Sequence, residues 1–271
     1  MQKVFNLTNK YMILLTPLIL YSMFSSIYLA FSIHGKLINI IFALILFTLM
    51  AAAFLAGWLN MVKKAVLDDQ KDDPNYLIKI FPESVGEYFL PSLGAIINVF
   101  IIFLAGLALS AVIGMNLIGD PGVTPEALSK AMTNTAELKN FVANLSPEQI
   151  IKINQWDFLV LGIMCFNYLI LFLYFPAIFF KTKNPYKAFW YSLKDLFSKK
   201  FLKTLAIFFL VIFIHMLVSV SSTLFSANSI LYFVITLLNF YFITAISIGI
   251  FYYYNQEFID QHLGQNIDIQ I

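Results

Sequence analysis

Only a few polar side chains that could do chemistry interrupt the long apolar stretches of this chain. Asn98, Asn167, His215 and Asn239 each stand among Phe, Leu, Val and Ile residues. Amides and an imidazole donate and accept hydrogen bonds, so they could line a polar path through a membrane or join neighbouring helices. A path requires the four side chains to meet in one cavity, whereas helix contacts would disperse them.

No catalytic or metal-binding pattern accompanies these residues. The sequence contains no phosphate-binding glycine loop, no His-Glu-x-x-His and no Gly-x-Ser-x-Gly. His215 has no second histidine or carboxylate nearby in the sequence, and the single Cys165 can form neither a disulfide framework nor a cysteine metal site. We therefore expect a protein that is not an enzyme and has no catalytic residue, metal or cofactor.

The composition indicates which elements carry these residues. The 271 residues are 60% hydrophobic and only 12% charged, which excludes an ordinary soluble domain. Each of six windows without Asp, Glu or Lys exceeds the roughly 20 residues that cross a bilayer as a helix. They cover residues 11–33, 37–62, 88–118, 158–180, 204–225 and 230–254. We predict an all-α polytopic membrane protein in one transmembrane domain. The lack of charge in the windows argues against ion-coupled transport.

Lysine placement predicts the orientation. Arginine is absent, and thirteen of the seventeen lysines fall on one side if the six windows all span the membrane. The positive-inside rule then puts both termini in the cytoplasm. A short aromatic and polar segment precedes the first, third and fifth spans, which predicts three parallel helical hairpins. Parallel repeats differ from the inverted repeats of many transporters.

Two segments outside the windows are predicted to be helical. Residues 119–157 form the longest extracytoplasmic loop, where Thr124-Pro125-Glu126 and Ser146-Pro147-Glu148 are typical helix starts. We expect two short helices there. Residues 186–203 alternate large apolar side chains with lysines, which predicts a cytoplasmic interfacial amphipathic helix. Its candidate contacts to lipid headgroups or to a partner are Lys187, Trp190, Lys194, Lys199, Lys200 and Lys203.

Small residues recur every four positions in two windows. Gly106, Ser110 and Gly114 form one series, and Ala52, Ala56 and Asn60 form another. Such series let helix backbones approach closely, either inside one protomer or between the protomers of a homo-oligomer.

The stretch Asn184-Pro185-Tyr186-Lys187-Ala188-Phe189-Trp190-Tyr191-Ser192-Leu193, with Lys199-Lys200-Phe201-Leu202-Lys203 after it, carries a resemblance. It is similar to bacterial six-helix proteins related to the membrane domain of glycerophosphoryl diester phosphodiesterases. The resemblance covers about twenty residues and the hairpin layout. It implies the architecture and a bacterial inner-membrane location, and it implies no hydrolase activity because the catalytic domain is absent.

Two functions fit this sequence. One is transport or the handling of lipids or other amphiphiles across the cytoplasmic membrane, with membrane lipids as partners and any ATPase supplied as a separate subunit. The alternative is an accessory, assembly or immunity-type membrane subunit that acts by binding a partner protein. A nucleic-acid partner is not expected. The sequence leaves both functions open.

Overall fold

The computed structural model describes residues 2–32, 37–68, 75–131, 133–225 and 228–259 of the chain. All the regular elements among the described residues are helices, and these residues contain no strand. They divide into two compact units. Unit 1 comprises Met1–Asn98 and Ile170–Ile271, and unit 2 comprises Val99–Leu169. Lys36 and Lys71, which entered the orientation argument, lie outside the described residues.

Every window predicted to span the membrane is mostly helical where it is described. The long helices are α2 (Leu15–Ser32), α3 (Leu37–Leu67), α4 (Tyr76–Leu117), α7 (Pro147–Leu171), α10 (Phe201–Leu224) and α11 (Ser229–Tyr254). Among the described residues, five stretches are long and apolar enough to cross a membrane, and α1 with α2 makes a sixth if that bent pair is one span. The prediction of a helical, multi-pass membrane protein is therefore confirmed.

Several helices extend beyond their predicted windows. The helix α4 begins at Tyr76, well before residue 88, and contains Pro82 and Pro91 in its interior. The helix α3 continues past residue 62 to Leu67. The windows were bounded by the nearest charge, but a lysine or glutamate at a helix end can reach the polar interface while the backbone stays helical. Charge therefore marks the edge of the apolar zone and not the end of the helix.

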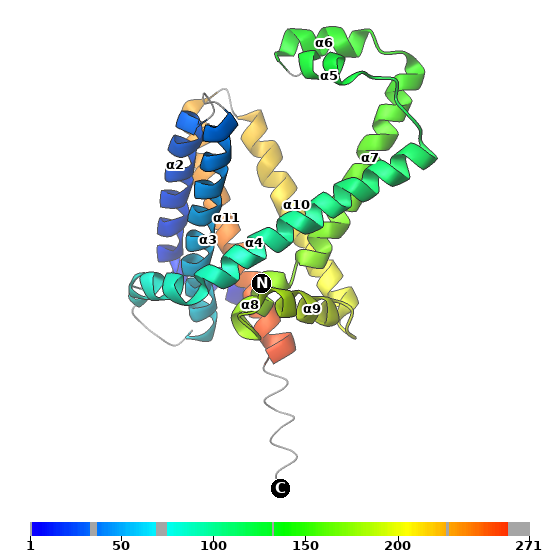
Figure 1. Cartoon of the computed structure of the whole chain (residues 1–271). Helices are drawn as coiled ribbons and strands as arrows, with labels where there is room; N and C mark the ends of the chain where they lie inside the picture. The colour runs from blue at the N-terminus through cyan, green and yellow to red at the C-terminus, as the bar shows by residue number, and fades with distance from the viewer. Residues whose placement is uncertain (1, 33–36, 69–74, 132, 226–227, 260–271) are drawn as a thin grey trace. The chain divides into compact units, whose positions relative to one another are not determined.

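In unit 1, α11 contacts α2, α3 and α10 (Figure 1). Before them, α1 (Gln2–Lys10) and the 3₁₀ turn η1 (Met12–Leu14) lead into α2 through a bend of 71°. Pro17 lies in the first turn of α2, where a missing N–H costs no helical hydrogen bond. The short helix α1 also packs on α11.

The tightly packed side chains of unit 1 lie at one end of its helices, the end that carries most of its lysines and is called the lysine-rich end below. Tyr11, Leu14, Met61, Tyr174 and Tyr254 are all fully buried there. At the opposite ends of α2, α3, α10 and α11, large side chains such as Phe24, Phe42, Phe213, Val220 and Phe233 are more than half exposed. Between 11% and 22% of the most apolar window of each spanning helix is buried, so these surfaces are suited to lipid.

The predicted fourth span is broken near its lysine-rich end. The helix α7 ends at Leu171, and α8 (Tyr174–Phe180) begins after a two-residue turn. Pro176 explains the break, because its missing N–H cannot bond the carbonyl of residue 172. The break puts Tyr174, Ala177, Ile178 and Phe179 in the core.

Unit 2 contains the C-terminal part of α4, most of α7, and the two short helices α5 (Pro125–Ala131) and α6 (Thr135–Ala143), which pack side by side (Figure 1). A Cβ added to Gly106 would lie 2.1 Å from Asn167 Nδ2, and one added to Gly114 would lie 2.3 Å from the Trp156 ring. The first small-residue series therefore lies where α4 and α7 of the same chain pack closely. Gly119, with φ of 82°, then ends the α4 segment and accepts a hydrogen bond from Trp156 Nε1 at 3.0 Å.

The loop between α4 and α7, which was predicted to be extracytoplasmic, differs in detail from its prediction. The proline at residue 125 does begin a helix, but that helix stops at Ala131 and a second one begins after Asn134. The Asn134 Oδ1 accepts the N–H of Glu137 at 2.9 Å, which caps α6. Ser146 exchanges hydrogen bonds with Gln149 in a capping box, and this cap opens the long helix α7 rather than a short one.

We predict that Gly114→Ala lowers the thermal stability of the purified protein in mild detergent by several degrees. The new methyl group would meet the rigid indole of Trp156, whose hydrogen bond to Gly119 holds it in place. Gly162→Ala is the matched control on α7, because nothing lies within 4 Å of a Cβ at that position. An unchanged melting temperature for Gly114→Ala would contradict the tight α4–α7 contact.

Candidate functional site

The helix α9 (Pro185–Leu196) is the core of the predicted interfacial segment. Asn184 caps it by accepting the N–H groups of Tyr186 and Lys187, and Pro185 occupies the first turn. The prediction of one helix over residues 186–203 is wrong in its C-terminal part. The helix ends at Leu196, and Phe201 begins α10, because Ser198 Oγ accepts the backbone N–H of Lys200 and turns the chain.

One face of α9 is buried and consists mainly of small side chains. Ala188, Ser192, Asp195 and Leu196 are buried at helical spacing. The first proline of the helix lies against α4, where a Cβ added to Gly94 would be 2.7 Å from Pro185 Cγ. The ring of Phe189 meets that of Tyr174 edge to face, with centroids 6.0 Å apart. These contacts fix α9 on the packed end of unit 1.

The opposite face of α9 is aromatic and basic. Tyr186, Trp190 and Phe197 expose more than 60% of their surface, and Trp190 exposes 70%. Lys187 and Lys194 are exposed on the adjoining strip of the helix. Aromatic rings beside lysines suit the boundary between acyl chains and headgroups, where the ring body is apolar and the ammonium group meets phosphate.

A buried ion pair holds the two faces in this orientation. Asp195 is 8% exposed, and its two carboxylate oxygens accept Lys181 Nζ at 2.8 and 2.7 Å. Tyr254 donates its hydroxyl to Asp195 Oδ2 at 2.6 Å. The three residues come from α9, from the end of α8 and from the end of α11. A carboxylate with three such bonds is fully compensated for its loss of water.

Three further lysines join helices at the same end of unit 1. Lys63 donates to the carbonyl oxygen of Phe179 at 2.6 Å, so α3 satisfies a free carbonyl near the C-terminus of α8. Lys200 contacts Glu257 Oε2 at 2.6 Å, and Lys203 pairs with the other oxygen of that carboxylate. Thr204 Oγ1 and Tyr253 Oη lie 2.7 Å apart. The start of α10 is thus tied to the end of α11.

The structure therefore separates the six predicted headgroup contacts into two groups. Lys187, Trp190, Lys194 and Lys199 are exposed. Lys200 and Lys203 share the Glu257 carboxylate, which offsets much of their charge. Lys203 is exposed too but is paired with Glu257, so the first group is the better candidate for an external contact.

The intramembrane asparagines bond to partners outside the predicted polar cluster. Asn98 is buried and donates to Tyr174 Oη at 2.9 Å within unit 1. Asn167 is buried and donates to the carbonyl oxygen of Ile102 at 3.4 Å within unit 2. Each bond joins α7 or α8 to α4. These two amides therefore join neighbouring helices, which was the alternative to lining a polar path. Asn60 behaves in the same way, since it donates to Ser84 Oγ at 2.8 Å.

The other two members of that cluster lie on α10 and α11. The side chain of His215 is exposed on α10, and Asn239 is half-buried on α11. No hydrogen bond joins any two of the four residues in the described part of the chain. Among the described residues, no group of three or more His, Cys, Asp and Glu side chains could hold a metal ion.

The sequence interpretation missed Asp195. It is the single acid in a segment that is rich in lysine, and it lies three and seven residues after Ser192 and Ala188. Those intervals place it on the face opposite Trp190 and Lys194, next to the smallest side chains of the helix. An acid on a small-residue face is a signal of burial. Its partner, Lys181, could not be chosen from among the neighbouring lysines without the fold.

Comparison of the chain with protein family models, with curated proteins and with solved structures gives no match.

We predict that Asp195→Asn lowers the free energy of unfolding in mixed micelles by about 3 kcal/mol, because the Lys181 ammonium group is left buried without its charge partner. Lys181→Met combined with Asp195→Leu should restore most of that loss, since an apolar pair needs no compensation.

The matched control is Lys183→Gln, which removes the exposed Lys183–Glu87 ion pair. That pair is solvated, so the control should cost less than about 1 kcal/mol. Equal losses for Asp195→Asn and the control would mean that the buried pair does not hold α9.

Proposed function

We propose that this protein handles lipids or similar amphiphiles at the cytoplasmic face of a bacterial inner membrane, as a non-enzymatic, multi-pass protein. Its three hairpins run in parallel, and both termini face the cytoplasm. In this proposal α9 contacts anionic headgroups, and the exposed apolar surfaces of the spans contact acyl chains. The resemblance to the membrane domain of glycerophosphoryl diester phosphodiesterases stays a prediction, and it bears on the architecture and the location but not on the substrate.

One observation carries the proposal. The outward face of α9 exposes Trp190 next to Lys187 and Lys194, while Asp195 fixes the inward face. A surface helix that only anchored the next span would need no such fixation, because partition into the interface already orients an amphipathic helix. A fixed face presents its cations in one geometry, which suits a repeated contact with phosphate groups.

The burial of the spans supports the same function. Most of the apolar surface of α10 and of the outer halves of α2, α3 and α11 faces outward. Hydrocarbon chains cover such a surface at no cost. A protein that binds amphiphiles needs both parts, a cationic strip at headgroup depth and apolar helix surfaces that continue from it.

We expect the protein, reconstituted in vesicles with anionic phosphatidylglycerol, to accelerate the exchange of a fluorescent phospholipid between the leaflets. The double variant Lys187→Gln/Lys194→Gln should slow this exchange by roughly fivefold or more, because each lysine near the surface contributes about 1 kcal/mol of attraction to anionic lipid. The rate is measured by quenching the outer leaflet with a reductant that does not cross the membrane.

The control is Lys130→Gln/Lys139→Gln, which removes the same charge from the exposed helices α5 and α6. It should leave the exchange rate unchanged. A wild-type rate equal to that of empty vesicles would overturn lipid exchange as the function.

The proposed orientation has its own test. In a Cys165→Ser background, we expect Lys139→Cys to react with an impermeant maleimide in intact spheroplasts, and Lys194→Cys to react only after permeabilisation. Both positions are exposed, so reactivity reports the side of the membrane and not burial. The reverse pattern would invert the topology.

The second candidate is a subunit that binds a partner protein, which the same face of α9 also supports. Exposed Trp and Tyr side chains are frequent anchors of protein interfaces. Purification from the native membrane in mild detergent distinguishes the two candidates. A stoichiometric membrane or ATPase subunit that is lost with Trp190→Ala favours the partner, whereas recovery with lipid alone favours lipid handling.

A further inference from the structure

One imidazole lies near the middle of a membrane-spanning helix. His215 is on α10, among apolar residues, and its side chain is exposed. Ionisable side chains within spanning helices almost always face protein or a water-filled cavity, because hydrocarbon offers them no hydrogen-bond partner. In the part of the chain that the structure describes, the His215 side chain forms no hydrogen bond. It therefore needs a partner that the described residues do not supply.

Asn239 lies at the same depth on the neighbouring helix α11. The chain passes from α10 to α11 between Phe225 and Asn228, and the two helices contact each other. His215 precedes Phe225 by ten residues, and Asn239 follows Asn228 by eleven. At the helical rise per residue, both lie roughly 16 Å from this turn. Asn239 is half-buried, and its amide also has no hydrogen bond among the described residues.

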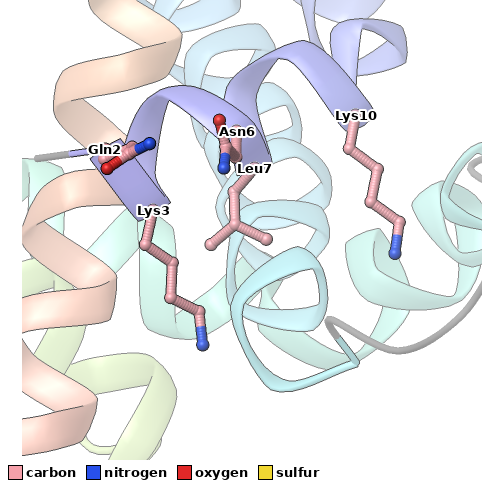
Figure 2. A pocket seen from close by; sticks show the side chains of 5 residues that line it. All are labelled: Gln2, Lys3, Asn6, Leu7 and Lys10. Carbon is pink, nitrogen blue, oxygen red and sulfur yellow. The ribbon is translucent and has the colours of Figure 1, made fainter.

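The cover by the rest of unit 1 ends close to both residues. On α10 the buried residues precede His215, and on α11 they follow Asn239. The short helix α1 covers α11 there, and its Leu7 is buried beside a surface pocket (Figure 2). Between His215 and Asn239, across the turn, no described residue is buried. The two polar residues thus begin the uncovered part of this helix pair.

His215 lies on the side of α10 that packs inside the protein. It follows the buried Phe208 by seven residues, and Ser219 follows it by four, so the three share one face of the helix. Ser219 is exposed, and its small side chain lets another helix approach closely. The opposite face carries apolar residues such as Phe213, which is 58% exposed and suits lipid. The protein-facing side of α10 therefore continues without cover.

We propose that this side of α10, together with Asn239, binds a second copy of the chain within the membrane. His215 and Asn239 are the hydrogen-bonding groups of the interface, and Ser219 lies where the two α10 helices approach each other. The interface goes beyond the proposed lipid handling and does not depend on it, because it requires only that α10 and α11 span the membrane.

The chemistry of these groups favours a second copy over a different protein. A neutral imidazole and an amide each donate and accept, so two identical faces can satisfy one another. In a symmetric dimer whose copies are inserted in the same direction, groups at equal depth meet. Residues 204–225 and 230–254 contain no Asp, Glu or Lys, so two copies do not repel each other there. A different protein would have to supply matching polar groups of its own.

The test measures the association of the full chain in phosphatidylcholine vesicles, by energy transfer between copies that carry a donor or an acceptor dye. The dyes are attached at Lys139→Cys, an exposed position of α6, in a Cys165→Ser background. Transfer should fall as the protein is diluted with lipid. Adding His215→Leu/Asn239→Leu should raise the dissociation constant roughly tenfold or more, because symmetry removes each group twice.

Asn116→Leu is the matched control. It removes an exposed asparagine from another spanning helix, α4, where the amide bonds to the carbonyl oxygen of Val112. This control should leave the dissociation constant unchanged. Equal constants for the double variant and the control would refute the interface, and so would transfer no greater than that between randomly placed proteins at the same density.

A second measurement does not rely on the double variant being folded. In a Cys165→Ser background, Ser219→Cys should form a disulfide-linked dimer when membranes are treated with a copper–phenanthroline oxidant, and Phe213→Cys, on the opposite face, should not. Equal dimer formation at both positions, or none at either, would count against the proposal. A disulfide from Ser219→Cys to another membrane protein, in place of the dimer, would contradict the second copy as the occupant.

Discussion

The contact between the Asp195 carboxylate and the Lys181 ammonium group is the interaction on which the arrangement of the lysine-rich end depends. It joins α9 to the end of α8, and the hydroxyl of Tyr254 adds the end of α11. A buried carboxylate requires partners of this strength, because the free energy of losing water would otherwise exceed any gain from packing. Without the pair, only the contacts of Pro185 and Phe189 and the small buried side chains would hold α9 on unit 1.

This constraint explains why unit 1 is packed most tightly at one end. Lipid gives helices no hydrophobic reason to associate, so packing inside a membrane depends on close backbones and on polar contacts. In unit 1 the ion pairs and the Tyr and Lys hydrogen bonds cluster at the lysine-rich end, and the buried aromatic side chains cluster with them. The opposite ends of the helices have few such groups and are left to the acyl chains.

The same physics separates lysines with structural roles from those with surface roles. Lys63, Lys181, Lys200 and Lys203 satisfy carbonyl or carboxylate oxygens of other helices. Lys187 and Lys194 are exposed on the outward face of α9. In this chain without arginine, lysine therefore both joins helices and presents positive charge at the surface. The position of an acceptor oxygen decides which of these roles a lysine has.

The sequence by itself determined the membrane class and the helical spans, because a backbone in hydrocarbon must satisfy its own hydrogen bonds and long uncharged windows leave no other structure. It also indicated the two faces of α9 and the small-residue series of α4. The tertiary structure alone decided that Gly106 and Gly114 face α7, that Asn98 bonds to Tyr174, and that Asp195 selects Lys181. Periodicity fixes the face on which a side chain lies. The residue opposite that face depends on how distant helices pack, and the long-range contacts that decide this leave no mark on local spacing.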